Sequence, residues 1–254
     1  MQADVLAIVG GWLAAPGSAR GFMTSGGTES ILMAVKAARD QFRHDKTRGI
    51  APNVVLPASA HAAFEKAGAY FGVEMRRVPV RPDWRADAEA MRATADDRTI
   101  MFVASAPQYP QGVVDPVREV AAVARERGAN CHVDACMGGV TLPYLARLGV
   151  DVPEWNFAVD GVTSISVDLH KFGYTAKGAS VIMYRDAALR SHQGLRNRQL
   201  ARRHVRLVGR ARHQVTRPVR CCVGRAAPPR RRRVLATRSR CARHRSDDRR
   251  RDRR

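Results

Sequence analysis

Apolar and polar residues follow two different periods along the first three quarters of the chain. Short apolar, β-branched runs are typical of buried strands, and longer segments with apolar residues every three to four positions are typical of amphipathic helices. The predicted strands occupy residues 53–57, 74–79, 99–105, 129–134, 162–168 and 179–184. The predicted helices occupy residues 2–15, 28–43, 60–71, 86–95 and 116–127. This alternation predicts a layered α/β domain with a mostly parallel sheet.

A glycine loop, Gly26-Gly27, leads into the second predicted helix, which opens with Thr28. Such a loop offers free backbone N–H groups and the positive end of the helix dipole, which together suit a phosphate. Thr28 and Ser30 are also good helix caps, so a capped helix without any ligand explains the same residues.

The charge of the chain is concentrated in its last quarter. The formal net charge is +21, and residues 194–254 hold 23 arginines, no lysine and three acidic residues. The remainder is therefore near neutral, and its partners need not be polyanions. Residues 191–254 also lack periodic apolar positions, so they are predicted to be a disordered tail that buries no core.

A shifted reading frame explains the composition of this tail. The stretch GLRNRQLARRHVRLVG, which begins at Gly194, can be back-translated so that the neighbouring frame encodes GYAIANWPGGMYGSSG. We therefore expect a frameshift near that residue. The alternative is an arginine-rich arm for nucleic acid, which the lack of lysine and of aromatic residues for base stacking disfavours.

One lysine, Lys171, directly follows an apolar run and stands between His170 and Gly173. A lysine amine can bond to an aldehyde as an imine. Asp134 ends another apolar strand, where a carboxylate is costly to bury unless a cation meets it. A cap on the following turn is the alternative for Asp134, and a half-exposed cap residue is the alternative for His61, which opens a predicted helix.

Together these features match the needs of pyridoxal phosphate. The glycine loop offers a phosphate cradle, His61 a flat ring, Asp134 a negative charge for the pyridine nitrogen and Lys171 an amine for the aldehyde. Burial and the nearby cationic imine are expected to make the neutral form of Lys171 easier to reach during turnover.

Four motifs carry a family resemblance: TSGGTES, SAPQYPQGVVDP, HVDACMGG and GVTSISVDLHKFGYTAKGAS. Residues 1–190 resemble the pyridoxal-phosphate-dependent group II decarboxylase family, and Cys136, two residues after Asp134, favours its sphingosine-1-phosphate lyase branch. The resemblance implies the large domain of fold type I pyridoxal-phosphate-dependent transferases, with helices on both faces of the sheet. It also implies a homodimer, a segment before residue 1 and a C-terminal small domain in place of residues 191–254.

The resemblance implies roles for the candidate residues. Lys171 would bond to the cofactor aldehyde, Asp134 would pair with the pyridine nitrogen and His61 would stack on the ring. The other implied cofactor contacts are Gly26, Gly27, Thr28, Ser166, Asp168 and His170. Tyr174 and Lys177 would meet a substrate phosphate, with simple solvation as the alternative for Lys177. No metal is expected.

The implied activity is cleavage of a phosphorylated sphingoid base into a long-chain aldehyde and phosphoethanolamine. Amino-acid decarboxylation is one alternative, and a non-catalytic remnant with a basic, nucleic-acid-binding tail is another. Without the flanking segments, we expect weak or no activity. No apolar run approaches the roughly 18–20 residues that span a membrane, and the first residues lack the basic start of a secretory signal, so we expect a cytoplasmic protein.

Overall fold

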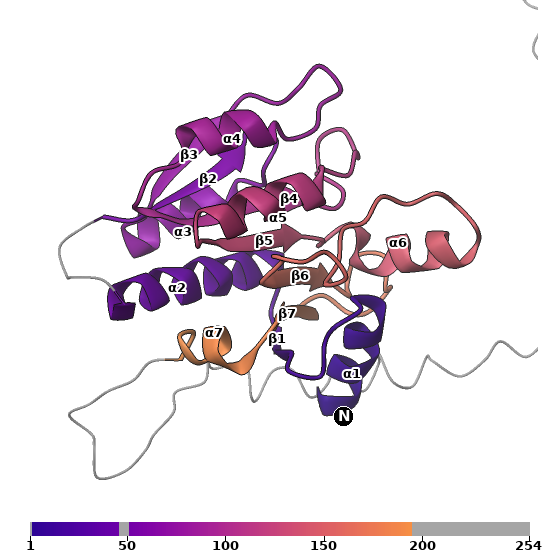
Figure 1. Ribbon diagram of the computed structural model, residues 1–254. Coiled ribbons are helices and arrows are strands. Elements are labelled where there is room, and N and C mark those ends of the chain that lie inside the picture. Colours follow the sequence, from indigo (N-terminus) through magenta and orange to yellow (C-terminus); the bar gives the residue numbers. More distant parts are fainter. Residues whose placement is uncertain (1, 46–50, 195–254) are drawn as a thin grey trace, which may run out of the picture.

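A computed structural model describes residues 2–45 and 51–194. The tail predicted to be disordered, residues 195–254, lies outside the described residues, so its disorder and the frameshift stay predictions. The described strands form one sheet with the order β1-β7-β6-β5-β4-β2-β3 (Figure 1). They are β1 (Arg20–Thr24), β2 (Asn53–Pro57), β3 (Glu74–Val78), β4 (Thr99–Ser105), β5 (Asn130–Asp134), β6 (Ser164–Asp168) and β7 (Ser180–Tyr184).

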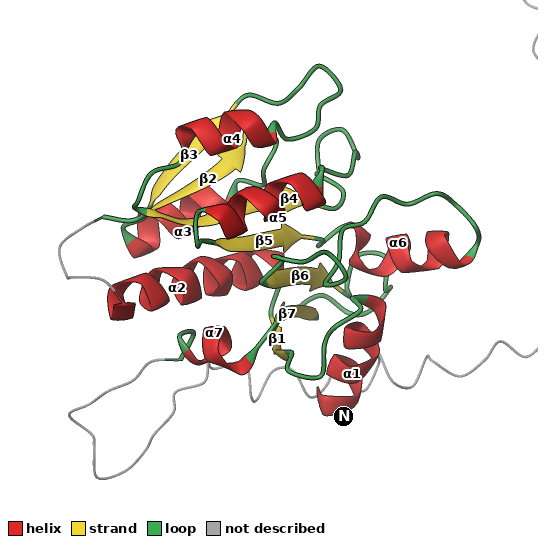
Figure 2. Cartoon of the chain, viewed as in Figure 1, coloured by secondary structure: helices red, strands yellow, loops and turns green. Residues whose placement is uncertain are grey.

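Helices cover both faces of this sheet (Figure 2). They are α1 (Gln2–Trp12), α2 (Gly27–Asp45), α3 (Ala63–Phe71), α4 (Ala88–Thr94), α5 (Val117–Glu126), α6 (Gly138–Arg147) and α7 (Ala187–Ser191). Apolar residues of α1, α4, α5 and α6 share one buried cluster. Those of α2, α3 and α7 share a second cluster. The predicted α/β architecture with helices on both faces is therefore confirmed.

The sheet is parallel except at β7. Strands β3, β2, β4, β5 and β6 pair in parallel, whereas β7 runs antiparallel to both β6 and β1. The carboxyl ends of β2, β4, β5 and β6 therefore meet at one edge. Open α/β sheets bind their ligands at this edge. Within residues 2–45 and 51–194, no helix combines the length and the apolar character that a bilayer crossing requires.

Strand periodicity predicted β2 to β7 with ends that differ by no more than two residues from those observed. Three elements were not predicted: β1, α6 and α7. In α6 the sequence carries Gly138, Gly139 and an internal Pro143, which are typical of loops. The helix forms nevertheless, because Val140 and Leu142 are buried in the cluster on its side of the sheet.

A buried carboxylate ties the loop after β4 to its surroundings. Asp115 is fully buried and accepts hydrogen bonds from the backbone N–H of Ala86 at 2.9 Å and of Ser105 at 2.7 Å. Burial raises the pKa of its carboxyl to about 6, although the two N–H groups and the charges of Arg85 and Arg81 oppose that rise. The loop that Asp115 closes carries Pro107 and Tyr109 to the sheet edge described below.

We predict that Asp115→Asn destabilises the fold by about 1–3 kcal/mol, because an amide NH2 would face one of the two N–H donors. The pKa of Asp115 is higher in the folded protein than its ordinary value of 3.8. The wild-type protein therefore loses stability from this group as pH rises from about 4 through about 6.

Urea unfolding of both proteins between about pH 4 and pH 7 checks this prediction. The stability difference between wild type and variant should shrink as pH rises, since all other groups are shared. A difference that widens with pH would contradict the assignment.

Candidate active site

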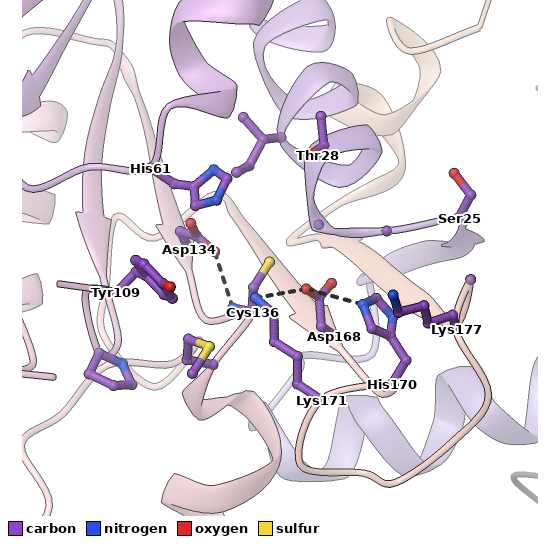
Figure 3. Close-up of a pocket in the computed structure, with 16 residues that line it drawn as sticks. Ser25, Thr28, His61, Tyr109, Asp134, Cys136, Asp168, His170, Lys171 and Lys177 are labelled. Atoms are coloured by element: carbon purple, nitrogen blue, oxygen red, sulfur yellow. Dashed lines mark hydrogen bonds and ion pairs between the residues drawn. The ribbon is translucent and has the colours of Figure 1, made fainter.

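A cavity of about 300 Å³ lies at the carboxyl edge of the sheet, where β5 and β6 end beneath the start of α2. Figure 3 shows side chains converging on it from segments far apart in the sequence. The lining residues are Ser25, Gly26, Gly27, Thr28, Ile31, His61, Pro107, Tyr109, Asp134, Cys136, Met137, Asp168, His170, Lys171, Lys177 and Gly178. The sequence analysis had singled out nine of these.

The start of α2 forms one wall of the cavity. Ser25 donates from both its backbone N–H and its hydroxyl to Glu29, each at 2.7 Å, which fixes the turn. The first N–H groups of a helix have no intrahelical partner, so this wall attracts an anion. A Cβ on Gly27 would lie 2.6 Å from the sulfur of Cys136 and 2.9 Å from Asp168 Oδ2. Glycine is therefore required for this close packing.

Lys171 projects from the turn after β6 and pairs with Asp168. The Lys171 Nζ to Asp168 Oδ2 distance is 3.0 Å. Asp168 is buried and also accepts a hydrogen bond from the Ser180 hydroxyl at 2.5 Å. Strand β7 thus contributes, through Ser180, to holding the carboxylate that holds the lysine.

This ion pair changes the expected protonation state of Lys171. Burial lowers the pKa of Lys171, but the negative charge of Asp168 raises it, with a further contribution from Asp134, and the net pKa is above its ordinary value. Burial therefore favours the neutral amine as expected, but in the cofactor-free protein the ammonium is favoured overall. The predicted access to the neutral amine during turnover stays a prediction. The burial of Lys171 is partial, and a carboxylate at contact distance outweighs it.

Asp134 ends β5 and lines the opposite part of the cavity floor. Its Oδ1 atom accepts hydrogen bonds from the Cys136 N–H at 3.1 Å and from the Ser166 hydroxyl at 3.2 Å. The side chain is almost fully buried. No ion pair joins Asp134 directly to Lys171 among the described contacts, and both line the same cavity.

His61 and Tyr109 come from loops that follow β2 and β4. The His61 Nδ1 atom accepts from the Ala63 N–H at 3.1 Å, which anchors the ring at the start of α3. The rings of His61 and Tyr109 meet edge to face with centroids 6.4 Å apart. His170 is held on the other side, where its Nδ1 lies 3.0 Å from the carbonyl of Ala179.

Two of the predicted site residues do not line the cavity. Ser166 is completely buried behind Asp134, so it acts on the cavity through that carboxylate rather than by direct contact. Tyr174 lies on the loop after Lys171 and is 80% exposed. It has a positive φ of 52°. Lys177, in contrast, reaches the cavity wall.

Several lining residues were not predicted. Tyr109 and Cys136 stood inside the motifs quoted for the resemblance, but nothing in their spacing marked them as facing a cavity. Cys136 is fully buried, and burial, reinforced by the charges of Asp134 and Asp168, raises the pKa of its thiol well above the ordinary value. It is therefore a neutral neighbour of Asp134 rather than a nucleophile.

The residues present fit pyridoxal phosphate. The cavity is lined by a carboxylate, Asp134, by an amine, Lys171, by the N-terminus of α2 and by loops that carry His61 and His170. The glycine at position 27 leaves open the space that a side chain would fill. This donor set is what an aromatic aldehyde with a ring nitrogen and a phosphate requires.

We predict that Asp168→Asn lowers the pKa of Lys171, because it removes the strongest of the charges that raise it. The pH dependence of acylation of Lys171 in cofactor-free protein, followed by peptide mass spectrometry, measures this. Labelling should reach its half-maximal rate at a lower pH in the variant. Asp134→Asn is the matched control, because Asp134 contributes less to the shift, and an equal effect of both variants would contradict the assignment.

We predict that Gly27→Ala weakens pyridoxal phosphate binding by at least about tenfold, because the new methyl group must displace Cys136 and Asp168. Fluorescence titration with pyridoxal phosphate measures the change. Gly11→Ala in α1 is the control, since a Cβ there meets nothing within 4 Å. Unchanged affinity in Gly27→Ala would show that the start of α2 is not part of the cofactor site.

Comparison with known proteins places this cavity in a family. Residues 1–214 match the model described as the pyridoxal-dependent decarboxylase conserved domain. Sphingosine-1-phosphate lyase from Arabidopsis thaliana is 47% identical over 181 residues, which cover 71% of this chain and 33% of that protein. A probable L-tyrosine/L-aspartate decarboxylase from Methanothermobacter thermautotrophicus is 34% identical over 188 residues, which cover 74% of this chain and 50% of the relative.

A solved structure gives the same result. Sphingosine-1-phosphate lyase from Burkholderia pseudomallei superposes with a TM-score of 0.73 at 41% identity, over 76% of this chain and 46% of that one. The chain therefore spans about a third of the length of the curated plant lyase and under half of the bacterial one. The family match extends past residue 190, and the predicted domain boundary there stays a prediction. The chain belongs to the pyridoxal-dependent decarboxylase family, whose cofactor is pyridoxal phosphate, and it is similar to that family's sphingosine-1-phosphate lyases.

Proposed function

We propose that the protein is a carbon–carbon lyase that cleaves a phosphorylated sphingoid base into a long-chain aldehyde and phosphoethanolamine. The observation that carries the proposal is the shared cavity of Asp134 and Lys171 at the N-terminus of α2. The relatives at 40–47% identity that are named sphingosine-1-phosphate lyase supply the substrate class.

Pyridoxal phosphate, when bound, supplies an aldehyde that bonds to amines and a cationic ring that takes up the electron pair of a breaking bond. Lys171 is the amine that would hold it. In the cofactor-free protein its ammonium is paired with Asp168 at 3.0 Å, so it must first give up a proton. When substrate displaces it, Lys171 can take a proton again beside the same carboxylate.

Asp134 and His61 would fix the ring. Asp134 presents a carboxylate at the end of β5 to the ring nitrogen, and an ionised carboxylate there favours the protonated nitrogen. His61 stands at the cavity wall with its ring orientation set by the Ala63 N–H. It offers a flat face for stacking.

Two cationic regions would hold the two phosphates. The N-terminus of α2, with Gly26, Gly27 and Thr28, and His170 across from it would hold the cofactor phosphate. Lys177 lies at the wall on the loop beyond Lys171. We assign it to the substrate phosphate, which an amino-acid substrate lacks.

The reaction at the substrate balances without a further reactant. The 3-hydroxyl loses its proton, its oxygen becomes the carbonyl of the aldehyde product, and the bond between the hydroxyl-bearing and amine-bearing carbons breaks. The electron pair remains on the amine-bearing carbon, which then takes a proton to give phosphoethanolamine. The cavity residues would select the bond through the orientation in which they hold the substrate.

The assembly and the compartment belong to the same proposal. Tyr144 and Leu145 on α6 and Leu148 directly after it expose large apolar side chains, as expected of a chain that pairs with a second copy. Cys131 and Cys136 are buried free thiols, which is consistent with a reducing compartment. We propose a homodimer in the cytoplasm.

We predict that purified protein supplied with pyridoxal phosphate acquires a visible absorption band that Lys171→Ala lacks entirely, because only the lysine amine bonds to the aldehyde. With a phosphorylated sphingoid base, phosphoethanolamine and aldehyde should appear in equal amounts and at the low rate expected above, and Lys171→Ala should reduce both below detection. Absorption spectroscopy and mass spectrometry of products make the two measurements. Lys66→Ala, on the exposed side of α3, is a matched lysine control.

Each outcome separates the alternatives. Carbon dioxide released from an amino acid, without phosphoethanolamine from the lipid, would identify a decarboxylase. A normal visible band without either product would indicate a cofactor-binding chain that lacks catalytic activity. A well-folded protein with no band at saturating cofactor would contradict the assignment of Lys171.

A further inference from the structure

A row of polar side chains is buried on the face of β5 and β6 that packs against α2 and α3. The opposite faces of these strands carry Val133, Ile165 and Val167 in the apolar cluster. Toward α2 and α3 lie instead His132, Asp134, Ser164, Ser166 and Asp168, all of them buried. Buried polar groups are costly unless they are hydrogen-bonded, so the partners of each one are informative.

His132 stands at the centre of this row. It is completely buried, and its ring meets that of Phe64 from α3 edge to face with centroids 6.1 Å apart. Its Nδ1 atom lies 2.8 Å from the Ser164 hydroxyl and its Nε2 atom lies 3.3 Å from the Ser166 hydroxyl. Both ring nitrogens therefore have partners on β6.

The hydrogen bonds of Ser166 determine which atom donates and which accepts in each contact of this row. The ionised carboxylate of Asp134 can only accept, so Ser166 gives its single hydroxyl proton to Asp134 Oδ1 at 3.2 Å. Ser166 must then accept from His132 Nε2, which places the ring proton on that atom. The Nδ1 atom accepts in turn from Ser164. Burial lowers the pKa of His132 to about 4, although the charge of Asp134 opposes this, so the ring is neutral and has one donor.

Each residue in this row therefore donates a hydrogen bond to the next: Ser164 to His132, His132 to Ser166, and Ser166 to Oδ1 of Asp134. The Cys136 N–H donates to the same oxygen at 3.1 Å. Two donors on Oδ1 restrain the orientation of this carboxylate, which lines the cavity.

We propose that His132 is a positioning residue that, through Ser166, fixes the Asp134 carboxylate against the ring nitrogen of pyridoxal phosphate. This proposal rests on the proposed function, in which Asp134 meets that nitrogen. A histidine that merely fills the core would affect the stability of the protein and its affinity for any cofactor analogue alike. A positioning residue affects recognition of the nitrogen alone.

The experiment compares pyridoxal phosphate with its deaza analogue, in which a C–H group replaces the ring nitrogen. Fluorescence titration of the full chain gives the dissociation constant of each, and their ratio measures how strongly the nitrogen is recognised. His132→Gln and His132→Asn form a matched pair. The glutamine amide can occupy the Nε2 position and donate to Ser166, whereas the asparagine amide reaches only the Nδ1 position.

We expect wild type to prefer pyridoxal phosphate over the analogue and His132→Gln to retain most of that preference. His132→Asn should lose about tenfold of it, because an oriented hydrogen bond to a charged group is removed, while its affinity for the analogue stays within about twofold. Ser166→Ala should behave as His132→Asn does. If the asparagine variant does not fold, the result for Ser166→Ala tests the proposal in its place.

The outcomes separate this proposal from the proposed function. Equal affinity of wild type for both cofactors would overturn the role of Asp134 itself. A wild-type preference that His132→Asn and Ser166→Ala both retain would overturn only the role of His132. Parallel loss of affinity for both cofactors in these variants would assign His132 to core packing and likewise overturn the proposal.

Discussion

The site depends on two carboxylates that end neighbouring strands in a buried place. Asp134 and Asp168 are both nearly inaccessible to solvent, and an isolated buried charge is strongly unfavourable. The two carboxylates have different kinds of hydrogen-bond and ion-pair partners. Asp134 receives neutral donors from Ser166 and the Cys136 backbone, whereas Asp168 receives a hydroxyl from Ser180 and the ammonium of Lys171. One carboxylate thus remains available to a cation from outside, and the other already holds one.

This division explains how one cavity serves two ends of a ligand. In the proposed function, the carboxylate that is held by neutral donors would meet the ring nitrogen. The lysine, whose pKa the neighbouring Asp168 raises, would remain an ammonium until the aldehyde binds. The parallel sheet makes the arrangement possible, because β5 and β6 deliver their last residues to the same edge. Helix α2 adds the third requirement, since its N-terminus opens on that edge.

Sequence reasoning reached the parts of this protein that depend on local patterns. Strands β2, β4, β5, β6 and β7 stood out as apolar runs, whereas β3 was predicted from a strand-like segment with two arginines. Asp134 stood out because it ends such a run, and Lys171 because it follows one. Strand β1 did not, because five residues between a Pro-Gly turn and a glycine loop show little periodicity, and it is defined by its pairing with β7. The hydrogen-bond partners of the site residues could not be predicted for the same reason. Whether Ser166 faces Asp134, or Ser180 faces Asp168, depends on strand register, which no single segment encodes.

The antiparallel strand β7 has a consequence for how the molecule is made. Within the described sheet, β1 pairs with β7 alone, although β1 lies near the start and β7 near the end of the described residues. During synthesis, β1 and the glycine loop that follows it leave the ribosome early. Strand β1 can pair with β7 only after nearly all of the other described residues have been synthesised. Contacts so distant along the chain form slowly. The strand that leads into the glycine loop therefore gains its partner in the sheet only after β7 has been synthesised.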